Sequence, residues 1–215
     1  MTIGWKRNSL IILGVIAFLI FILWLMNFIF PLQYSIKYST IVTTHDGTVA
    51  HAYLSSDDKW RMKSEVQEVS VALKKIIVAK EDKYFYHHFG VNPVAILRAF
   101  FNNFFHHKKT SGASTITMQV ARLLEPKKRT YSNKLIEIFR ALQLEWMFSK
   151  KEILQLYLNL VPYGGNIEGV KSASVLYFQK LPDHLSIAQA VVLSIVPNRP
   201  TSLALYASRD KLLAA

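Results

Sequence analysis

The sequence predicts a mainly α-helical domain that follows one transmembrane helix and a small β-hairpin linker. Three observations carry this prediction. An uncharged apolar run covers residues 10–30, an Asp-Gly pair lies between β-prone runs at residues 46–47, and apolar residues recur at helical spacing after Ser64. We therefore divide the chain into a cytoplasmic N-terminus (1–9), a transmembrane helix (10–30), a β-rich linker (31–63) and a globular domain (64–215).

The apolar run at residues 10–30 is long enough to cross a membrane, because a helix of about 20 apolar residues spans the hydrocarbon core. A secretory signal has a shorter apolar region, about 7–15 residues, followed by a small-residue cleavage site. The sequence has no such site here, so we expect a retained anchor. Lys6 and Arg7 precede the run, which favours a cytoplasmic N-terminus. The chain is then a single-pass protein of the cytoplasmic (inner) membrane, with its globular domain on the periplasmic face.

The elements after the anchor are predicted from local signals. Asp46-Gly47 between runs rich in Thr, Val and Tyr indicates a β-hairpin. Serine followed three residues later by Glu or Gln is typical of a capping box, and Asn92-Pro93 is a plausible cap and first-turn pair for a helix through Phe105. We therefore expect further helices to begin after Ser64, Ser149 and Ser186, with irregular loops at residues 105–114, 124–130 and 162–166.

The charge of the chain narrows its partners. The formal net charge is +12, and only Lys6 and Arg7 of the basic residues precede the anchor. Such an excess favours anionic partners. Beside a membrane anchor these are lipid head groups and lipid-linked phosphates rather than nucleic acid. The chain has no cysteine, which excludes disulfides, thiolate metal sites and cysteine nucleophiles.

Acidic residues in two segments of the chain are candidates for catalysis. Glu81 and Asp82 directly follow an apolar helical stripe, and Glu137 lies on a later helix among apolar residues. Glycosyl chemistry uses two carboxylates from separate elements, one as general base and one at the leaving group. The alternative interpretation is that each glutamate is a solvated helix residue. The basic residues between His106 and Lys134 have the same two interpretations, a diphosphate site or a solvated loop.

Five short motifs follow one another along the globular domain. The first is E-D-x-x-F-x-x-H-x-G at residues 81–90. The second is G-A-S-T-I-T-M-Q at residues 112–119, and the third is K-x-x-E at residues 134–137. The fourth is K-x-x-I-L-x-x-Y-L-N at residues 150–159, and the fifth covers residues 165–178.

These motifs resemble the peptidoglycan glycosyltransferase family, glycosyltransferase family 51. The family occurs as monofunctional transglycosylases and as the first domain of class A penicillin-binding proteins. Met118 stands where the family pattern has Gln, and Asn133 stands where it has Arg. Within the family, Met118, the phrase MQVARLLEP and the hairpin before Trp60-Arg61 are most similar to the penicillin-binding protein 1C type. Members of that type continue into a transpeptidase domain, for which this sequence has no counterpart.

The resemblance implies a lysozyme-like fold and polymerisation of lipid II into glycan strands, with inversion at the anomeric carbon and release of polyprenyl diphosphate. It implies that Glu81 is the general base and that Glu137 assists at the diphosphate, directly or through a divalent cation. The loop at residues 105–114 would be a mobile flap. The remaining residues that the resemblance assigns to substrate binding are Asp82, His88, Gly112, Ser114, Thr115, Gln119, Arg122, Arg129, Lys134 and Asn159.

The resemblance also implies the partners. These are lipid II, the growing lipid-linked glycan, the cytoplasmic membrane and other proteins of cell-wall synthesis. No cofactor is obligatory, and Mg2+ or Mn2+ is the divalent cation that would act with Glu137. Two alternatives remain open: a non-catalytic, truncated penicillin-binding protein that serves as an anchored binding module, and a lysozyme-like enzyme that cleaves peptidoglycan.

Overall fold

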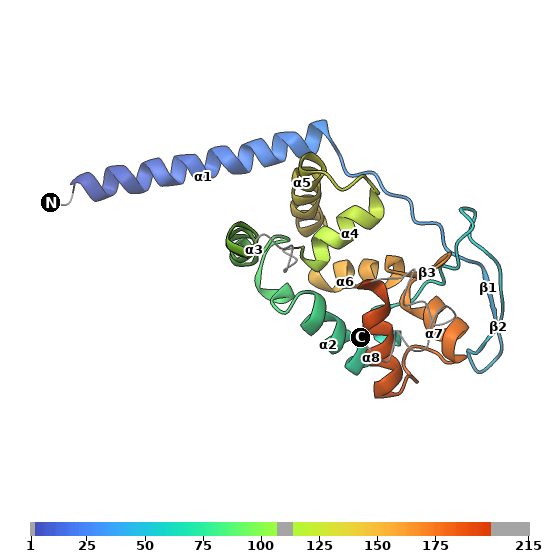
Figure 1. Cartoon of the computed structure of the whole chain (residues 1–215). Coiled ribbons are helices and arrows are strands. Elements are labelled where there is room, and N and C mark those ends of the chain that lie inside the picture. Colours follow the sequence, from blue (N-terminus) through green and yellow to red (C-terminus); the bar gives the residue numbers. More distant parts are fainter. Residues whose placement is uncertain (1–2, 107–113, 199–215) are drawn as a thin grey trace. The chain divides into compact units, whose positions relative to one another are not determined.

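The computed structural model describes residues 3–106 and 114–198. The chain divides into two compact units, Met1–Tyr34 and Ser35–Ala215. Within the described residues the architecture is mainly helical with short antiparallel strand pairs, which confirms the predicted fold class (Figure 1).

The first unit holds a single long helix, α1 (Ile3–Ile29). Its segment Leu10–Ile29 is apolar enough to cross a membrane, with a mean hydropathy of 2.8. Apolar side chains of this segment are exposed, and the aromatic rings of Phe21, Trp24 and Phe28 stack along the helix. The helix fits a single-pass membrane protein, as the sequence predicts.

The second unit begins with an antiparallel hairpin and continues with helices. Strands β1 (Ile41–Thr43) and β2 (Val49–Ala52) pair with Ile41 opposite Ala52, which confirms the hairpin predicted from Asp46-Gly47. The helical elements that follow in the first half are η1 (Val66–Glu68), α2 (Val71–Glu81), η2 (Phe85–His87) and α3 (Pro93–His106). Those of the second half are α4 (Ile116–Leu124), α5 (Tyr131–Met147), α6 (Lys150–Leu160), α7 (Val170–Phe178), α8 (Ile187–Ile195) and η3 (Val196–Asn198).

Helix α4 lies at the centre of this unit and packs on both α5 and α6. The side chains of Ile116, Met118 and Val120 on α4 are fully buried. Helix α2 packs on α8, and its core residue is Leu73. Met118 therefore lies in the core, so this departure from the family pattern is a packing residue.

Three predicted helix starts are confirmed and one is wrong. Helix α3 begins at Pro93, and the side chain of Asn92 accepts the N–H of Ala95 at 3.0 Å. Ser149 and Ser186 form capping boxes with Glu152 and Gln189, as the sequence predicts. The capping box expected at Ser64 does not start α2. Both the backbone N–H and the carbonyl of Ser64 bind the Asn159 side chain at 2.8 Å, and α2 begins after the cap Ser70.

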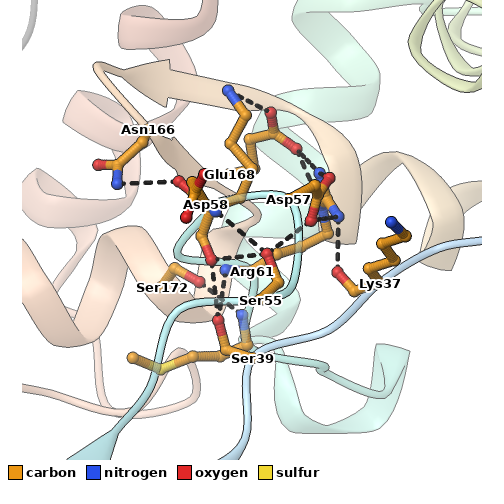
Figure 2. Close-up of polar contacts among 11 residues, drawn as sticks. Lys37, Ser39, Ser55, Asp57, Asp58, Arg61, Asn166, Glu168 and Ser172 are labelled. Atoms are coloured by element: carbon orange, nitrogen blue, oxygen red, sulfur yellow. Dashed lines mark hydrogen bonds and ion pairs between the residues drawn. The ribbon is translucent and has the colours of Figure 1, made fainter.

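The loop predicted at residues 162–166 is a short antiparallel hairpin of β3 (Pro162–Gly164) and β4 (Ile167–Glu168). Residues 35–63, predicted as a linker, lie in the same compact unit as the helices. The side chain of Arg61 joins them to this hairpin (Figure 2). Its guanidinium lies 2.6 Å from the Glu168 carboxylate and 3.0 Å from that of Asp57, and it donates to the Lys37 carbonyl at 2.6 Å.

Gly169 is the cap of α7 and permits a close approach between the β3–β4 hairpin and α6. Its φ is +83°, and a Cβ added there would lie 2.7 Å from the Asn159 carbonyl oxygen. We expect Gly169→Ala to lower the free energy of unfolding by about 3 kcal/mol, because it adds a steric clash to backbone strain. Gly47→Ala is the matched control, since Gly47 has φ +82° but no atom within 4 Å of that Cβ. Equal losses for both variants in urea unfolding would contradict the clash.

Candidate active site

The carboxylate of Glu81 lies at the last residue of α2, and its side chain is only 13 % exposed. The side-chain amide of Gln119 donates to Glu81 Oε2 at 3.1 Å. Gln119 projects from α4, the central core helix. A glutamate held by an amide on a rigid neighbouring helix has a fixed orientation, which a general base requires.

Asp82 connects α2 to the start of α4. Its side chain is 4 % exposed, and its carboxylate accepts the backbone N–H of Ile116 at 3.0 Å. The same carboxylate lies 3.0 Å from Nε2 of His88. Asp82 and His88 are therefore both committed to a buried network. That network positions the first turn of α4, which carries Gln119.

Thr115 caps α4 and ties the second motif to the first. Its hydroxyl accepts the N–H of Met118 at 3.1 Å and donates to the carbonyl of Gly90 at 2.5 Å. Gly90 has a φ of +75°, and a Cβ there would lie 2.8 Å from the Ala141 carbonyl of α5. The first two motifs and α5 are thus fixed against one another around Glu81.

A second polar cluster contains the other predicted carboxylate. The ammonium of Lys134 donates to the Ser114 hydroxyl at 2.6 Å and pairs with Glu137 Oε2 at 2.8 Å. The structure therefore brings together three of the predicted site residues. Arg122 and Arg129 form no ion pair with a carboxylate of the described chain, so their charges are available to an anionic ligand.

The remaining predicted residues are placed differently. Asn159 is fully buried, and within the described part of the chain its amide binds backbone groups, those of Ser64 and Gln155. Asn133, in the first turn of α5, donates its side-chain amide to the Lys128 carbonyl at 2.8 Å and so fixes the loop next to Arg129. Gly112, and residues 107–113 of the predicted flap, lie outside the described residues.

Residues 46–214 match the transglycosylase family. The chain belongs to this family.

Similar proteins of known identity include penicillin-binding proteins, the group that the motifs predict. The chain is 38 % identical over 200 residues to penicillin-binding protein 1C of Escherichia coli, an alignment that covers 92 % of this chain. It is 36 % identical over 159 residues to penicillin-binding protein 1A of the same organism, covering 73 % of this chain. It spans 26 % and 19 % of the length of these two relatives. The predicted family resemblance is confirmed.

Two buried phenols, those of Tyr157 and Tyr163, interact electrostatically with Glu81. Burial raises the pKa of Tyr157, and the Glu81 charge raises it further. Burial also raises the pKa of Tyr163 far above its usual range, again with a contribution from Glu81. Tyr157 belongs to the fourth motif, but the sequence analysis did not single out Tyr163. Only its Pro-Tyr-Gly context after α6 could have indicated a buried phenol.

The Tyr163 hydroxyl makes no hydrogen bond within the described chain although it is buried. We expect Tyr163→Phe to raise the free energy of unfolding by about 1 kcal/mol, because an unsatisfied buried hydroxyl is removed. The raised pKa keeps the folded-state phenol neutral, so wild-type stability is full below pH about 10 and falls above it, where the unfolded phenol ionises. The variant should lose less stability there.

The matched control for this change is Tyr177→Phe. The Tyr177 hydroxyl donates to the Tyr163 carbonyl at 2.8 Å, so this variant should lose about 1 kcal/mol. Thermal unfolding at pH 7 and pH 11 tests both variants. A lower melting temperature for Tyr163→Phe at pH 7 would contradict the expectation.

The residues around Glu137 do not fit a divalent cation site built by the protein alone. Glu137 offers one carboxylate, and an ammonium lies 2.8 Å from it. Within the described ranges, no group of three or more His, Cys, Asp or Glu side chains is placed so that it could hold a metal ion. Mg2+ and Mn2+ take six oxygen ligands in an octahedral arrangement, and Mg2+ usually binds one or two carboxylates together with waters and substrate phosphates. The described residues around Glu137 therefore do not form a cation site by themselves, and the Glu137 carboxylate pairs with Lys134 instead.

Proposed function

We propose that this transglycosylase is a peptidoglycan glycosyltransferase that polymerises lipid II, using the growing lipid-linked glycan as donor. The observation that carries the proposal is the Glu81 carboxylate, largely buried and held at 3.1 Å by the amide of Gln119. The match to the transglycosylase family and to penicillin-binding proteins 1C and 1A supports it.

In the proposed reaction the Glu81 carboxylate accepts the proton of the acceptor 4-hydroxyl. The hydroxyl oxygen forms a bond to the anomeric carbon of the donor from the face opposite the diphosphate, so the configuration inverts. The bond from that carbon to the diphosphate oxygen breaks, and polyprenyl diphosphate leaves with the electron pair. An inverting glycosyl transfer requires a base that removes the proton of the nucleophile, and attack from the face opposite the leaving group.

The negative charge that develops on the diphosphate requires cationic partners. Lys134 lies between Ser114 and Glu137 and is 36 % exposed, so its ammonium is accessible to a ligand. Arg122 and Arg129 carry charges without carboxylate partners within the described chain. We assign these three cations to the diphosphate, because guanidinium and ammonium groups bind phosphate oxygens by charge-assisted hydrogen bonds. Glu137 acts by orienting Lys134.

The test is polymerisation of labelled lipid II by the detergent-solubilised full chain. We expect glycan polymer together with one polyprenyl diphosphate released for each bond formed. Lipid II binding without polymer would instead support the anchored binding module. Fragments released from preformed peptidoglycan would support the cleaving enzyme. The proposed orientation, with the N-terminus in the cytoplasm and the domain on the periplasmic face, is tested by protease access in spheroplasts.

A further inference from the structure

A groove of about 570 Å³ lies between α2, η1 and the first turns of α6. Four lysine side chains line it, and no acidic residue does. Its volume is within the range of about 300–1,000 Å³ that is usual for small-molecule sites. The lysines are Lys74, Lys75, Lys83 and Lys151.

These lysines differ from several other lysines of the same unit in that they form no ion pair with a carboxylate of the described chain. Lys59, Lys127, Lys150 and Lys171 each lie within 3.4 Å of a carboxylate oxygen. None of the groove lysines has such a partner in the part of the chain that the structure describes. Lys74 donates to the backbone carbonyl of Val66 at 2.8 Å, which fixes its ammonium without neutralising it. The groove therefore concentrates positive charge, which the interaction of Lys151 with the Glu65 carboxylate offsets only in part.

The rest of the groove lining is apolar. Leu154 and Val66 are buried at its floor, whereas Val71 and Tyr86 are 62 % and 58 % exposed. A surface valine and tyrosine next to unpaired ammonium groups suit a ligand with two parts, one anionic and one hydrocarbon. An inorganic anion would leave the apolar wall unused, and a neutral hydrocarbon would leave the cations unused.

We propose that this groove binds the phosphate head group and upper acyl chain of an anionic membrane phospholipid. The candidate membrane helix Leu10–Ile29 is part of the same chain, so it holds the domain at a high effective lipid concentration. Clusters of lysines near a membrane are attracted to anionic lipids. The limited volume fits one lipid head group and favours this ligand over an acidic protein partner, which needs a larger surface.

The proposed lipid site is separate from the candidate active site. Glu81 ends α2 but does not line the groove, and its partner Gln119 projects from α4. The proposal therefore stands whether or not the chain polymerises lipid II. Its test uses lipid binding, which Glu81→Gln should leave unchanged.

The experiment titrates the detergent-solubilised full chain with phosphatidylglycerol and counts bound lipid by native mass spectrometry. The groove variant is Lys75→Gln with Lys83→Gln. The control is Lys37→Gln with Lys180→Gln, which removes the same charge from exposed lysines that lie outside the groove. We expect about a tenfold weaker affinity for the groove variant and less than about a twofold change for the control. Lipid bound to the apolar helix is common to all variants.

A third variant separates shape from charge. Ala79 lines the groove and is exposed, so Ala79→Phe should fill the groove while keeping all four lysines. We expect this variant to bind phosphatidylglycerol about fivefold more weakly than the wild-type chain. In the wild-type chain, bound phosphatidylglycerol should slow amide hydrogen exchange at residues 71–86. Unchanged unfolding midpoints establish that the variants are folded.

Four results would overturn the proposal. The first is an equal loss of affinity in the groove and control variants. The second is that zwitterionic phosphatidylcholine binds as tightly as phosphatidylglycerol. The third is that inorganic phosphate alone displaces the lipid at a similar concentration, which would make the groove a simple anion site. The fourth is that an acidic amphipathic peptide protects residues 71–86 from amide hydrogen exchange while the lipid does not, which would assign the groove to a protein partner.

Discussion

Glu81→Gln is expected to lower the rate of lipid II polymerisation by about a thousandfold, the scale of a lost general base. The amide has the size and shape of the carboxylate, and its oxygen still accepts the N–H of Gln119 that now binds Glu81 at 3.1 Å. It cannot accept the proton of an attacking hydroxyl. The variant should therefore keep its fold and its substrate affinity and lose turnover.

The measurement compares initial rates of polymer formation and polyprenyl diphosphate release for wild type and variant. Glu65→Gln is the matched control, since the Glu65 side chain is partly exposed to solvent and pairs with Lys63, which is not a predicted site residue. It should retain the wild-type rate. Turnover that persists in Glu81→Gln at a comparable rate, with the melting temperature unchanged, would remove Glu81 from the role of base.

Asp82→Ala is expected to lower the free energy of unfolding by about 3 kcal/mol or more. The change leaves two buried groups without their acceptor, the N–H of Ile116 and Nε2 of His88, and each such loss costs about 1–3 kcal/mol. The start of α4 then loses its attachment to α2. Polymerisation should also fall, because α4 carries the Gln119 that orients Glu81.

Denaturant unfolding of the detergent-solubilised chain measures this loss. Asp82→Asn keeps one oxygen acceptor for the Ile116 N–H and should lose about half as much. Asp183→Ala is the control, because Asp183 is exposed and its nearest basic nitrogen is that of His184 at 3.8 Å. An unfolding midpoint for Asp82→Ala equal to that of the control would contradict the anchoring role.

The candidate site shows where prediction from sequence reaches its limit. The motifs named Glu81, Gln119, Ser114, Lys134 and Glu137, and the structure joins them into two clusters. The same motifs did not distinguish cleft residues from packing residues. Asp82 and Asn159 have the same standing in the motifs as Glu81 and Gln119, yet both are buried. Asp82 binds the Ile116 N–H and the His88 ring, and Asn159 binds the backbone of Ser64.

The sequence by itself determined the features that depend on near neighbours. The apolar segment at residues 10–30, the hairpin at Asp46-Gly47 and the capping boxes at Ser149 and Ser186 all follow from interactions within a few residues. Such interactions have the same geometry in any fold, because one turn of helix or hairpin closes its own hydrogen bonds. A local pattern is then sufficient to predict them.

Only the tertiary structure decided which polar side chains hold distant segments together. The capping signal at Ser64 is overridden because Asn159, 95 residues away, binds both of its backbone groups. Arg61 joins the segment predicted as a linker to Glu168, 107 residues away. Contacts at such separations depend on which faces pack together, and burial makes an unpaired polar group costly. Packing therefore selects the partners that local spacing leaves open.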